Sequence, residues 1–404
     1  MRKQILIFSH ALEIGGAERA LLGLLENIDT ERYEVDLFLM RHEGELLPLL
    51  PPGIHLLPEI RQYSDMAIPA ATVIKRGDFR VLYGRLRGKL RAKHKVKELK
   101  YPTDNGVGLE YSHKYTLPYM PYITDKVYDI VISFLTPHYY AAHRIHARKK
   151  IAWIHTDYST FPIDIESEYN MWAQYDHIVA ISEDCRNAFL SLFPALKDKL
   201  CIIKNIMAAS VIDRQRYMIP DNFSEYETDS IILLTVGRFV HQKNMDNIPN
   251  ICRRIVEKGL DIKWYLIGDG NGETLIRERI KKEGMEQRVI ILGPKTNPYP
   301  YMDQCDLYVQ PSRYEGHSVA VREAQYLHKP VVITEYATAA SQLDHNVDGI
   351  IVPMDNEGCA EGIFRLLNDK ALMTRLQNEC ARRDYTNKRE IEKIYNLFSL
   401  CACE

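Results

Sequence analysis

Apolar runs of four to six residues recur along most of the chain, separated by amphipathic or turn-rich segments. Such alternation is typical of parallel strands connected by helices, with both faces of the sheet covered. The pattern predicts an α/β fold with two doubly wound domains. The runs that predict its strands are 5–9, 35–40, 54–57, 129–134, 150–155, 177–182 and 201–204 in the first half, and 231–236, 263–267, 289–292, 306–309, 330–334 and 349–352 in the second.

The regular pattern is interrupted once between the two sets of strands. Residues 208–230 are polar, lack periodicity and contain Pro220, which is typical of an interdomain linker. We therefore expect a first domain over 1–207 and a second over 231–387. A chain of 404 residues is long enough for two α/β domains of this size.

A second interruption lies inside the first domain. The segment 75–100 carries eleven cations against two acidic residues, and Leu82, Leu86 and Leu90 recur among them at helical spacing. A basic amphipathic helix of this kind indicates a membrane-surface or partner-binding element, with a solvated helix face as the alternative. The residues that follow, 101–122, are rich in Tyr and Pro and predict a long loop. The cations are Lys75, Arg76, Arg80, Arg85, Arg87, Lys89, Arg91, Lys93, Lys95, Lys97 and Lys100.

Composition narrows the class of protein. The 52 basic and 54 acidic side chains nearly cancel, so no nucleic acid or other polyanion is expected to bind the whole surface. The eight cysteines form no Cys-x-x-Cys pair and no His cluster has zinc-like spacing, which favours a reduced, cytoplasmic protein without a metal centre. No apolar stretch approaches the ~20 residues of a membrane span, and Glu13 and Glu18 follow the first strand too soon for a signal peptide.

The densest candidate chemistry follows the predicted strand 306–309. Glu315 lies in the turn after it, and Glu323 lies eight residues later, in a predicted helix. Gly316 between them permits positive φ and a close approach of the backbone to a ligand. The free N–H groups at the start of that helix suit a phosphate. The stretch predicts an anion cradle between two hydrogen-bond acceptors, although two Glu residues at this spacing also occur in ordinary helices.

Two further turns present groups suited to phosphate. Gly237, Arg238 and Lys243 follow the strand 231–236 and bring two cations to its end, where Arg gives bidentate contacts and Lys a point charge. Gly15 and Gly16 follow the first strand and would expose backbone N–H groups, although a Gly pair also serves a tight turn.

Three other features are weaker. His155 follows the strand 150–155 at the end where open α/β sheets bind ligands, although a lone His is more often structural. The run 268–272 contains three glycines, but Glu273 replaces the last glycine of a dinucleotide fingerprint, so we expect a tight turn there. Asp164 and Glu166 end no strand and are expected to be surface charges.

The stretch 310–324 resembles the Glu-x7-Glu signature of retaining glycosyltransferases of family 4, which have the two-domain GT-B fold. The resemblance extends over nearly the whole chain. Gly237-Arg238 with Lys243-Asn244 resembles the diphosphate clamp of that family, and 152–157 resembles the segment whose histidine contacts the donor sugar. His317 and Ser318 depart from the usual Phe-Gly, which leaves the identity of the sugar open.

The resemblance implies a set of site residues. Catalytic roles fall to Glu315, His155, Arg238 and Lys243, with no metal ion and no cofactor. It further implies two Rossmann-like domains facing across a cleft, with a last helix within 388–404 that packs on the first domain. The implied donor-binding residues are Gly15, Gly16, Gly237, Arg238, Lys243, Pro294, Lys295, Glu315, Gly316, His317, Ser318, Val319 and Glu323.

The expected activity is the transfer of a sugar from a nucleotide diphosphate, with UDP as the default, to an acceptor hydroxyl. The acceptor would be a glycan or a lipid-linked molecule of cell-surface polysaccharide or glycolipid synthesis. The segment 75–100 would contact an anionic membrane at the inner face of the plasma membrane. The alternative enzyme is a nucleotide-sugar epimerase or hydrolase of the same fold. The alternative that is not an enzyme is an adaptor that binds a membrane or another polyanion. The sequence leaves double displacement and same-face substitution both open.

Overall fold

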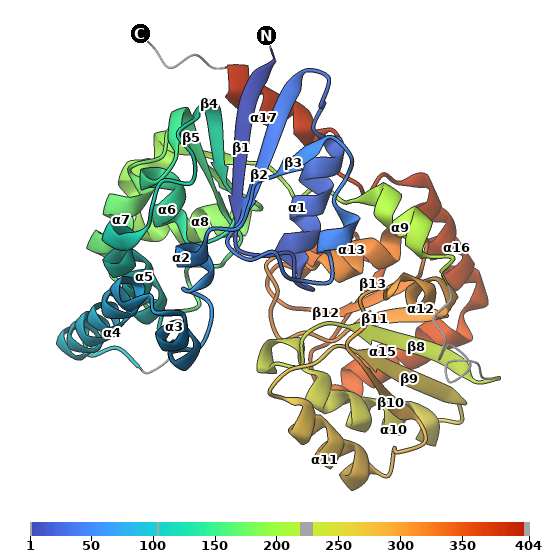
Figure 1. Cartoon of the computed structure of the whole chain (residues 1–404). Coiled ribbons are helices and arrows are strands. Elements are labelled where there is room, and N and C mark those ends of the chain that lie inside the picture. Colours follow the sequence, from blue (N-terminus) through green and yellow to red (C-terminus); the bar gives the residue numbers. More distant parts are fainter. Residues whose placement is uncertain (1, 103–104, 219–228, 400–404) are drawn as a thin grey trace. The chain divides into compact units, whose positions relative to one another are not determined.

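The computed structural model describes residues 2–102, 105–218 and 229–399. The chain forms two compact units, one from Met1–Ile206 with Asn387–Glu404 and the other from Met207–Thr386. Each unit is built on one parallel sheet with helices on its faces (Figure 1).

The sheet of the first unit has seven strands in the order β3-β2-β1-β4-β5-β6-β7. Its centre is apolar because Ile5, Leu6 and Ile7 are fully buried between the helical layers. The chain order reverses between β1 and β4, and open α/β sheets bind their ligands at the carboxyl ends of the strands at such a reversal. The strands are β1 (Lys3–Ser9), β2 (Tyr33–Leu39), β3 (Ile54–Leu56), β4 (Val127–Ser133), β5 (His146–Ile154), β6 (His177–Ala180) and β7 (Leu200–Ile202).

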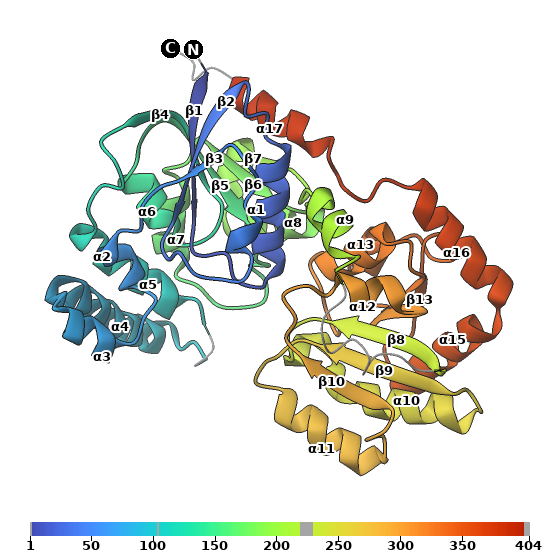
Figure 2. The ribbon, with the colours of Figure 1, turned by 45° about the vertical axis from the view of Figure 1, so that its right-hand side comes forward.

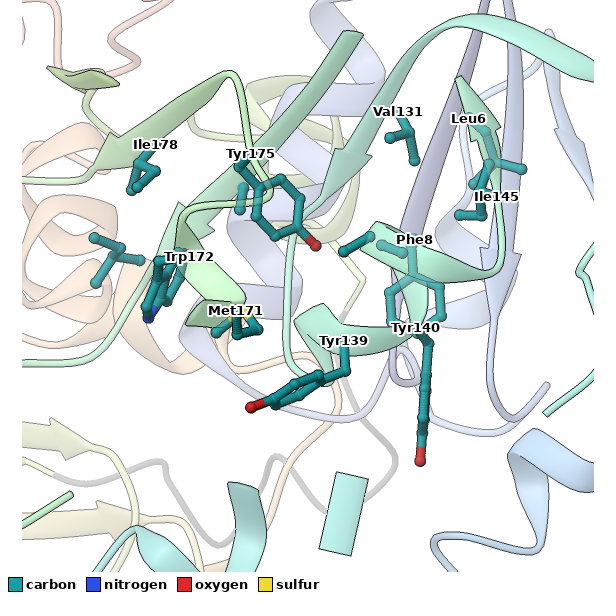
Figure 3. Packing of buried hydrophobic residues seen from close by; sticks show 14 of the residues in the cluster. Leu6, Phe8, Val131, Tyr139, Tyr140, Ile145, Met171, Trp172, Tyr175 and Ile178 are labelled. Atoms are coloured by element: carbon teal, nitrogen blue, oxygen red, sulfur yellow. The ribbon is translucent and has the colours of Figure 1, made fainter. Parts of the chain in front are cut away.

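Aromatic side chains fill the space beside this sheet. Phe8 from β1 lies with Tyr140, Trp172 and Tyr175 in one cluster, and Figure 3 shows these rings gathered beside the strands. The helices of this unit are α1 (Gly16–Asn27), α2 (Arg61–Ser64), α3 (Ala70–Arg76), α4 (Phe79–Leu99), α5 (Val107–Thr116), α6 (His138–His143), α7 (Ile165–Trp172), α8 (Glu183–Leu192) and α17 (Glu390–Ser399).

The predicted loop over 101–122 is wrong, because α5 occupies its middle. Its prolines flank the helix and do not interrupt it. Gly84 and Gly88 of α4 allow α5 to pack closely, since a Cβ at Gly88 would lie 2.6 Å from the carbonyl oxygen of Tyr111. Tertiary packing through two glycines therefore stabilises a helix whose composition resembles a loop.

The second unit repeats the architecture with six strands in the order β10-β9-β8-β11-β12-β13. All pairs are parallel, and the order reverses between β8 and β11. The strands are β8 (Ile231–Val236), β9 (Ile262–Ile267), β10 (Val289–Gly293), β11 (Leu307–Gln310), β12 (Val331–Thr334) and β13 (Ile350–Val352). The helices are α9 (Ala209–Gln215), α10 (Ile248–Glu257), α11 (Glu273–Glu283), α12 (Tyr299–Gln304), α13 (Val319–Tyr326), α14 (Ala339–Gln342), α15 (Asn356–Asn368) and α16 (Lys370–Arg382).

The segment 208–230 differs from the predicted linker. Helix α9 lies in it, and Ile212 is buried in the core of the second unit together with Leu234 and Tyr308. Arg216 also forms an ion pair with Asp303, at 2.5 Å. The second unit therefore begins at Met207, and the part of the predicted linker over 219–228 lies outside the described residues.

The last described helix, α17, belongs to the first unit. Lys149 Nζ donates to the carbonyl of Leu397 at 2.8 Å, and the Tyr395 ring stacks on Tyr33 with centroids 5.2 Å apart. Figure 2 shows α17 beside the strands near the N-terminus. Residues 400–404 of the predicted segment 388–404 lie outside the described part.

The contact of Gly88 with α5 gives a matched pair of stability tests. Gly88→Ala should destabilise the protein by about 1–3 kcal/mol, because its Cβ meets a backbone carbonyl that cannot move alone. Gly108→Ala, where a Cβ meets no atom within 4 Å, should stabilise α5 by about 0.5–1 kcal/mol. Denaturant unfolding measures both, and equal effects at the two positions would contradict the close packing.

Candidate functional site

The candidate site of the second unit lies where β8 and β11 end. These strands are neighbours, and the chain order reverses between them. The carboxyl ends of parallel strands share one edge of the sheet, and open α/β sheets bind ligands at that edge where the chain order reverses. The segments after β8 and after β11 therefore meet there, although more than 70 residues separate them in sequence.

The centre of this edge is an ion pair between the two segments. Lys243 Nζ lies 2.5 Å from Glu315 Oε1, and the side chains are only 17% and 5% exposed. Ser312 Oγ donates to the same carboxylate oxygen at 2.6 Å, and Gln242 Nε2 lies 3.4 Å from the other. The pair is nearly desolvated, so each charge depends on the other for compensation.

Further contacts fix the two segments against each other. Asn244 is buried with a left-handed backbone (φ 57°), and its Nδ2 donates to the carbonyl of Pro311 at 2.8 Å. Arg313 makes two parallel bonds to Asp246, both 3.0 Å long. The geometry of Lys243 and Glu315 is therefore held by the backbone around them as well as by the pair itself.

The turn after β8 is positioned by a glycine-rich neighbour. The backbone N–H of Phe239 donates to the carbonyl of Asp269. A Cβ at Gly268 would lie 1.9 Å from the carbonyl oxygen of Gly237, and one at Gly270 2.6 Å from that of Phe239. Both glycines also have positive φ. The run 268–272 is therefore the tight turn that the sequence predicts. It also packs against the backbone of Gly237 and Phe239, on either side of the exposed Arg238, a role that the sequence did not indicate.

Gly316 does not adopt the positive φ that a glycine permits. A Cβ at this position would meet no atom within 4 Å, so its surroundings are open. Gly237 also lacks positive φ, and its added Cβ would meet the stem of Lys243 at an ordinary 3.6 Å. The glycines that need positive φ are therefore Gly268 and Gly270 of the neighbouring turn. Gly237 and Gly316 instead leave space beside the backbone.

Helix α13 begins directly after this open stretch. No side chain caps its first turn from Ser318, while the N–H of Ser318 itself donates to Gln342 Oε1 at 2.6 Å. His317 is half-buried, and Val319 is the first residue of the helix. The helix start thus presents backbone N–H groups at the carboxyl edge, as an anion site requires.

Glu323 lies deeper than the other predicted residues. It is 4% exposed, and the hydroxyl of Tyr299 donates to its Oε1 at 2.9 Å. Pro294 and Lys295 follow β10, which is the outermost strand on one side of the sheet. Lys295 Nζ lies 5.9 Å from the centre of the Tyr301 ring. The structure places these three residues at or near the carboxyl edge that also holds Glu315.

The remaining predicted residues lie in the first unit. Gly15 precedes α1 with an extended backbone and Gly16 begins the helix, so both stand at the carboxyl end of β1, again with no side-chain cap. His155 follows β5, and its ring hydrogen-bonds to the backbone of Phe134. Its Nε2 is buried and has no partner.

Burial keeps several imidazoles of this edge neutral. It lowers the pKa of His155 to about 4, and it lowers the pKa values of His138 and His113 to about 3. With a proton on the nitrogen that faces Phe134, the Nε2 of a neutral His155 is a hydrogen-bond acceptor. His155 is therefore suited to accept a bond from a hydroxyl.

Asp164 is not the surface charge that we expected. It is 7% exposed, caps α7 by accepting from the N–H of Ser167, and accepts from the hydroxyl of Tyr111 at 2.7 Å. Glu166 is exposed as predicted. The preceding turn and the helix start at 165 give Asp164 a structural role that an Asp-x-Glu pattern alone does not indicate.

Within the described residues, no group of three His, Cys, Asp or Glu side chains is arranged to hold a metal ion.

Residues 220–383 match the family model described as glycosyl transferases group 1. The chain is 25% identical over 235 residues to the capsular polysaccharide biosynthesis glycosyltransferase CapM of Staphylococcus aureus, covering 55% of this chain and 61% of the relative. It is 29% identical over 153 residues, 37% of this chain and 41% of the relative, to the N-acetylgalactosamine-N,N'-diacetylbacillosaminyl-diphospho-undecaprenol 4-alpha-N-acetylgalactosaminyltransferase of Campylobacter jejuni. The matches thus span only about four to six tenths of these relatives' lengths.

Solved structures resemble the chain over nearly its full length. HepE of Anabaena in complex with UDP and glucose gives a TM-score of 0.66 at 15% identity, covering 98% of this chain and 100% of that one. A glycosyltransferase of Rickettsia africae gives 0.67 at 15% identity, covering 99% and 100%. Together with the two parallel sheets, this similarity confirms the predicted two-domain α/β fold of GT-B type.

Proposed function

We propose that the chain is a retaining glycosyltransferase of the family 4 type, which transfers a sugar from a nucleotide diphosphate to an acceptor hydroxyl. The observation that carries the proposal is the desolvated Lys243–Glu315 pair, which lies at the β8–β11 reversal of a domain that matches glycosyl transferases group 1. UDP is the proposed nucleotide, supported by the UDP-bound structure among the similar folds.

The diphosphate would be bound by positive and partially positive groups. Arg238 is exposed at the end of β8 and can contact two phosphate oxygens. Lys243 has three N–H donors, so it can retain Glu315 with one and meet phosphate with another. The N–H groups at the start of α13 would add to the same field. Charge that accumulates on the leaving diphosphate is then stabilised by groups already in place.

Glu315 and His155 would bind the sugar. Glu315 accepts from Lys243 and Ser312, and these donors reduce its nucleophilicity, so we assign it as a hydrogen-bond acceptor for the sugar and not as a covalent nucleophile. Same-face substitution, with the leaving phosphate taking the acceptor's proton, is the mechanism this favours. The Nε2 of His155 would accept a sugar hydroxyl.

The other residues would hold the rest of the donor. Glu323, fixed by Tyr299, would accept from the ribose hydroxyls, and Pro294 with Lys295 would lie against the base. The open space at Gly316 would admit the sugar phosphate, with His317, Ser318 and Val319 beside it. Gly15 and Gly16 would offer backbone N–H groups to the donor.

We infer the acceptor from the relatives' names. One relative acts in capsular polysaccharide biosynthesis, and the name of another contains a diphospho-undecaprenol acceptor. We therefore propose a glycan or lipid-linked acceptor, used by a cytoplasmic enzyme at the inner face of the plasma membrane. The segment 75–100 would be its contact with anionic lipid.

Removing the charge of Glu315 tests its role. Glu315→Gln keeps the shape but loses the ion pair with Lys243, and turnover should fall by about 100-fold or more. Transfer of labelled sugar measures this, and product should form only when an acceptor is present. Glu166→Gln, at an exposed site, should leave turnover unchanged. Full activity of Glu315→Gln would remove Glu315 from the mechanism.

The phosphate contacts are tested by comparing two ligands. Arg238→Ala or Lys243→Ala should weaken UDP binding by about 1.5–3 kcal/mol, the range for a charge-assisted hydrogen bond, while uridine binds as before. Lys282→Ala on the exposed side of α11 serves as the control. Calorimetry that finds equal losses for UDP and uridine shows that the two cations are not phosphate ligands.

We further propose that transfer needs no metal ion, because Arg238, Lys243 and the start of α13 supply the positive charge. Activity should therefore persist in excess EDTA. A loss that added Mg²⁺ restores would overturn this proposal and would assign part of the neutralisation to a cation.

A further inference from the structure

Helices α3, α4 and α5 form a group at one end of the first unit, on the side where the carboxyl ends of its strands lie (Figures 1 and 2). Helix α4 has one buried face. Its buried residues are Val81, Gly84, Gly88 and Ala92, and the two glycines bring it against the backbone of α5. These four residues form the side of α4 that packs against the rest of the unit. The opposite side of the helix faces away from that contact.

That opposite side is apolar and exposed. Phe79, Tyr83, Leu86 and Leu90, which we call the α4 stripe, are 65%, 56%, 55% and 59% exposed. Their spacings of four, three and four residues align them along one side of the helix. Leu82, which the sequence placed with Leu86 and Leu90, is half-buried and lies outside the stripe. Four large apolar side chains in one exposed row mark an interaction surface.

Exposed cations border the stripe on both sides. By helical spacing, Lys89 and Lys93 lie along one side, and Arg80, Arg87 and Arg91 along the other; all five are exposed. Arg85 does not take part, because its guanidinium donates to the carbonyls of Asp65 and Ile68 within the unit. The surface therefore combines apolar side chains with unburied positive charge.

We propose that the α4 stripe and its bordering cations bind an anionic phospholipid surface. Phe79, Tyr83, Leu86 and Leu90 enter the boundary between headgroups and acyl chains, while the cations stay at the lipid phosphates. The helix lies in the plane of the membrane, with α5 behind it. Contact with the membrane would bring the enzyme to a lipid-linked acceptor. This purpose rests on the proposed function, whereas the contact itself is argued from α4.

The charge around the α4 stripe favours a phospholipid surface over a second copy of the chain as the partner. A symmetric dimer through the stripe would set the same five cations against their copies, and the helix has no acidic side chain from Phe79 to Lys97 to offset them. A phospholipid surface instead offers negative phosphates on both sides of the row. No described helix is both long and apolar enough to cross a bilayer.

Co-sedimentation of the full chain with vesicles tests the surface. Binding to phosphatidylcholine vesicles should appear only when phosphatidylglycerol is included, and it should weaken as salt is raised, because exposed charges are screened beyond about 8 Å at physiological ionic strength. Equal binding to neutral and anionic vesicles, or none to either, overturns the proposal.

Two variants separate the apolar from the electrostatic part. Leu86→Ser with Leu90→Ser, and Arg80→Gln with Lys89→Gln and Lys93→Gln, should each lower the vesicle partition coefficient by at least about tenfold. The controls are Leu275→Ser and the triple change Lys281→Gln, Lys282→Gln and Lys370→Gln, all at exposed positions of the second unit. Losses of equal size in the controls would contradict the assignment to α4.

UDP binding by each variant keeps this test apart from the proposed function. The α4 variants should bind UDP as the parent chain does, which also shows that they fold. A chain that binds anionic vesicles but not UDP contradicts the proposed donor and leaves the surface standing. A chain that binds UDP but not the vesicles overturns the surface alone. A stripe variant that changes oligomeric state without changing vesicle binding makes the stripe a protein interface and overturns the proposal as well.

Discussion

Parallel pairing of the strands is the constraint on which the rest of the structure depends. Because every strand of a sheet runs the same way, each connection returns to the opposite edge, and all turns after the strands collect at one edge. At the reversal of chain order, the turns that follow two neighbouring strands meet. In the second unit that geometry brings Lys243 and Glu315 together, and in the first it brings Gly15 and His155 to the equivalent edge. The direction of the strands therefore sets where the candidate site residues of both units lie, whatever their side chains are.

The Lys243–Glu315 pair illustrates how the shared direction of parallel strands leads to a fixed distance between two atoms. Asn244 binds the backbone of Pro311, Arg313 binds Asp246, and the carbonyl of Glu315 accepts from Thr338. None of these contacts needs to touch a substrate. They hold two turns in register, so that a desolvated charge pair keeps one geometry and does not relax toward water. The glycines at 268 and 270 act in the same way through the backbone of Gly237 and Phe239.

Much of this organisation could be predicted from the sequence because buried parallel strands leave continuous apolar runs. Every predicted run overlaps a strand, and the motif residues after β8 and β11 follow from their position at strand ends. Features that depend on distant backbone could not be predicted. Helix α5 forms because Gly84 and Gly88 admit it, α9 packs through Ile212 inside a polar segment, and Asp164 becomes a buried cap. The surroundings of Gly316 likewise follow from the fold and not from the identity of the residue.

The place of α17 has a consequence for the order in which the protein is made. The first unit is discontinuous: roughly 180 residues of the second unit are synthesised before α17 exists to meet Tyr33 and Lys149. The N-terminal sheet must therefore emerge from the ribosome lacking one of its covering helices, with part of its apolar surface waiting for the last segment. Closing that long loop depends on the intervening unit, whose two ends meet where the N–H of Met207 donates to the carbonyl of Thr386. A folded second unit thus shortens the gap that α17 has to bridge. Folding of the second unit therefore helps to complete the first unit, although the second unit is synthesised later.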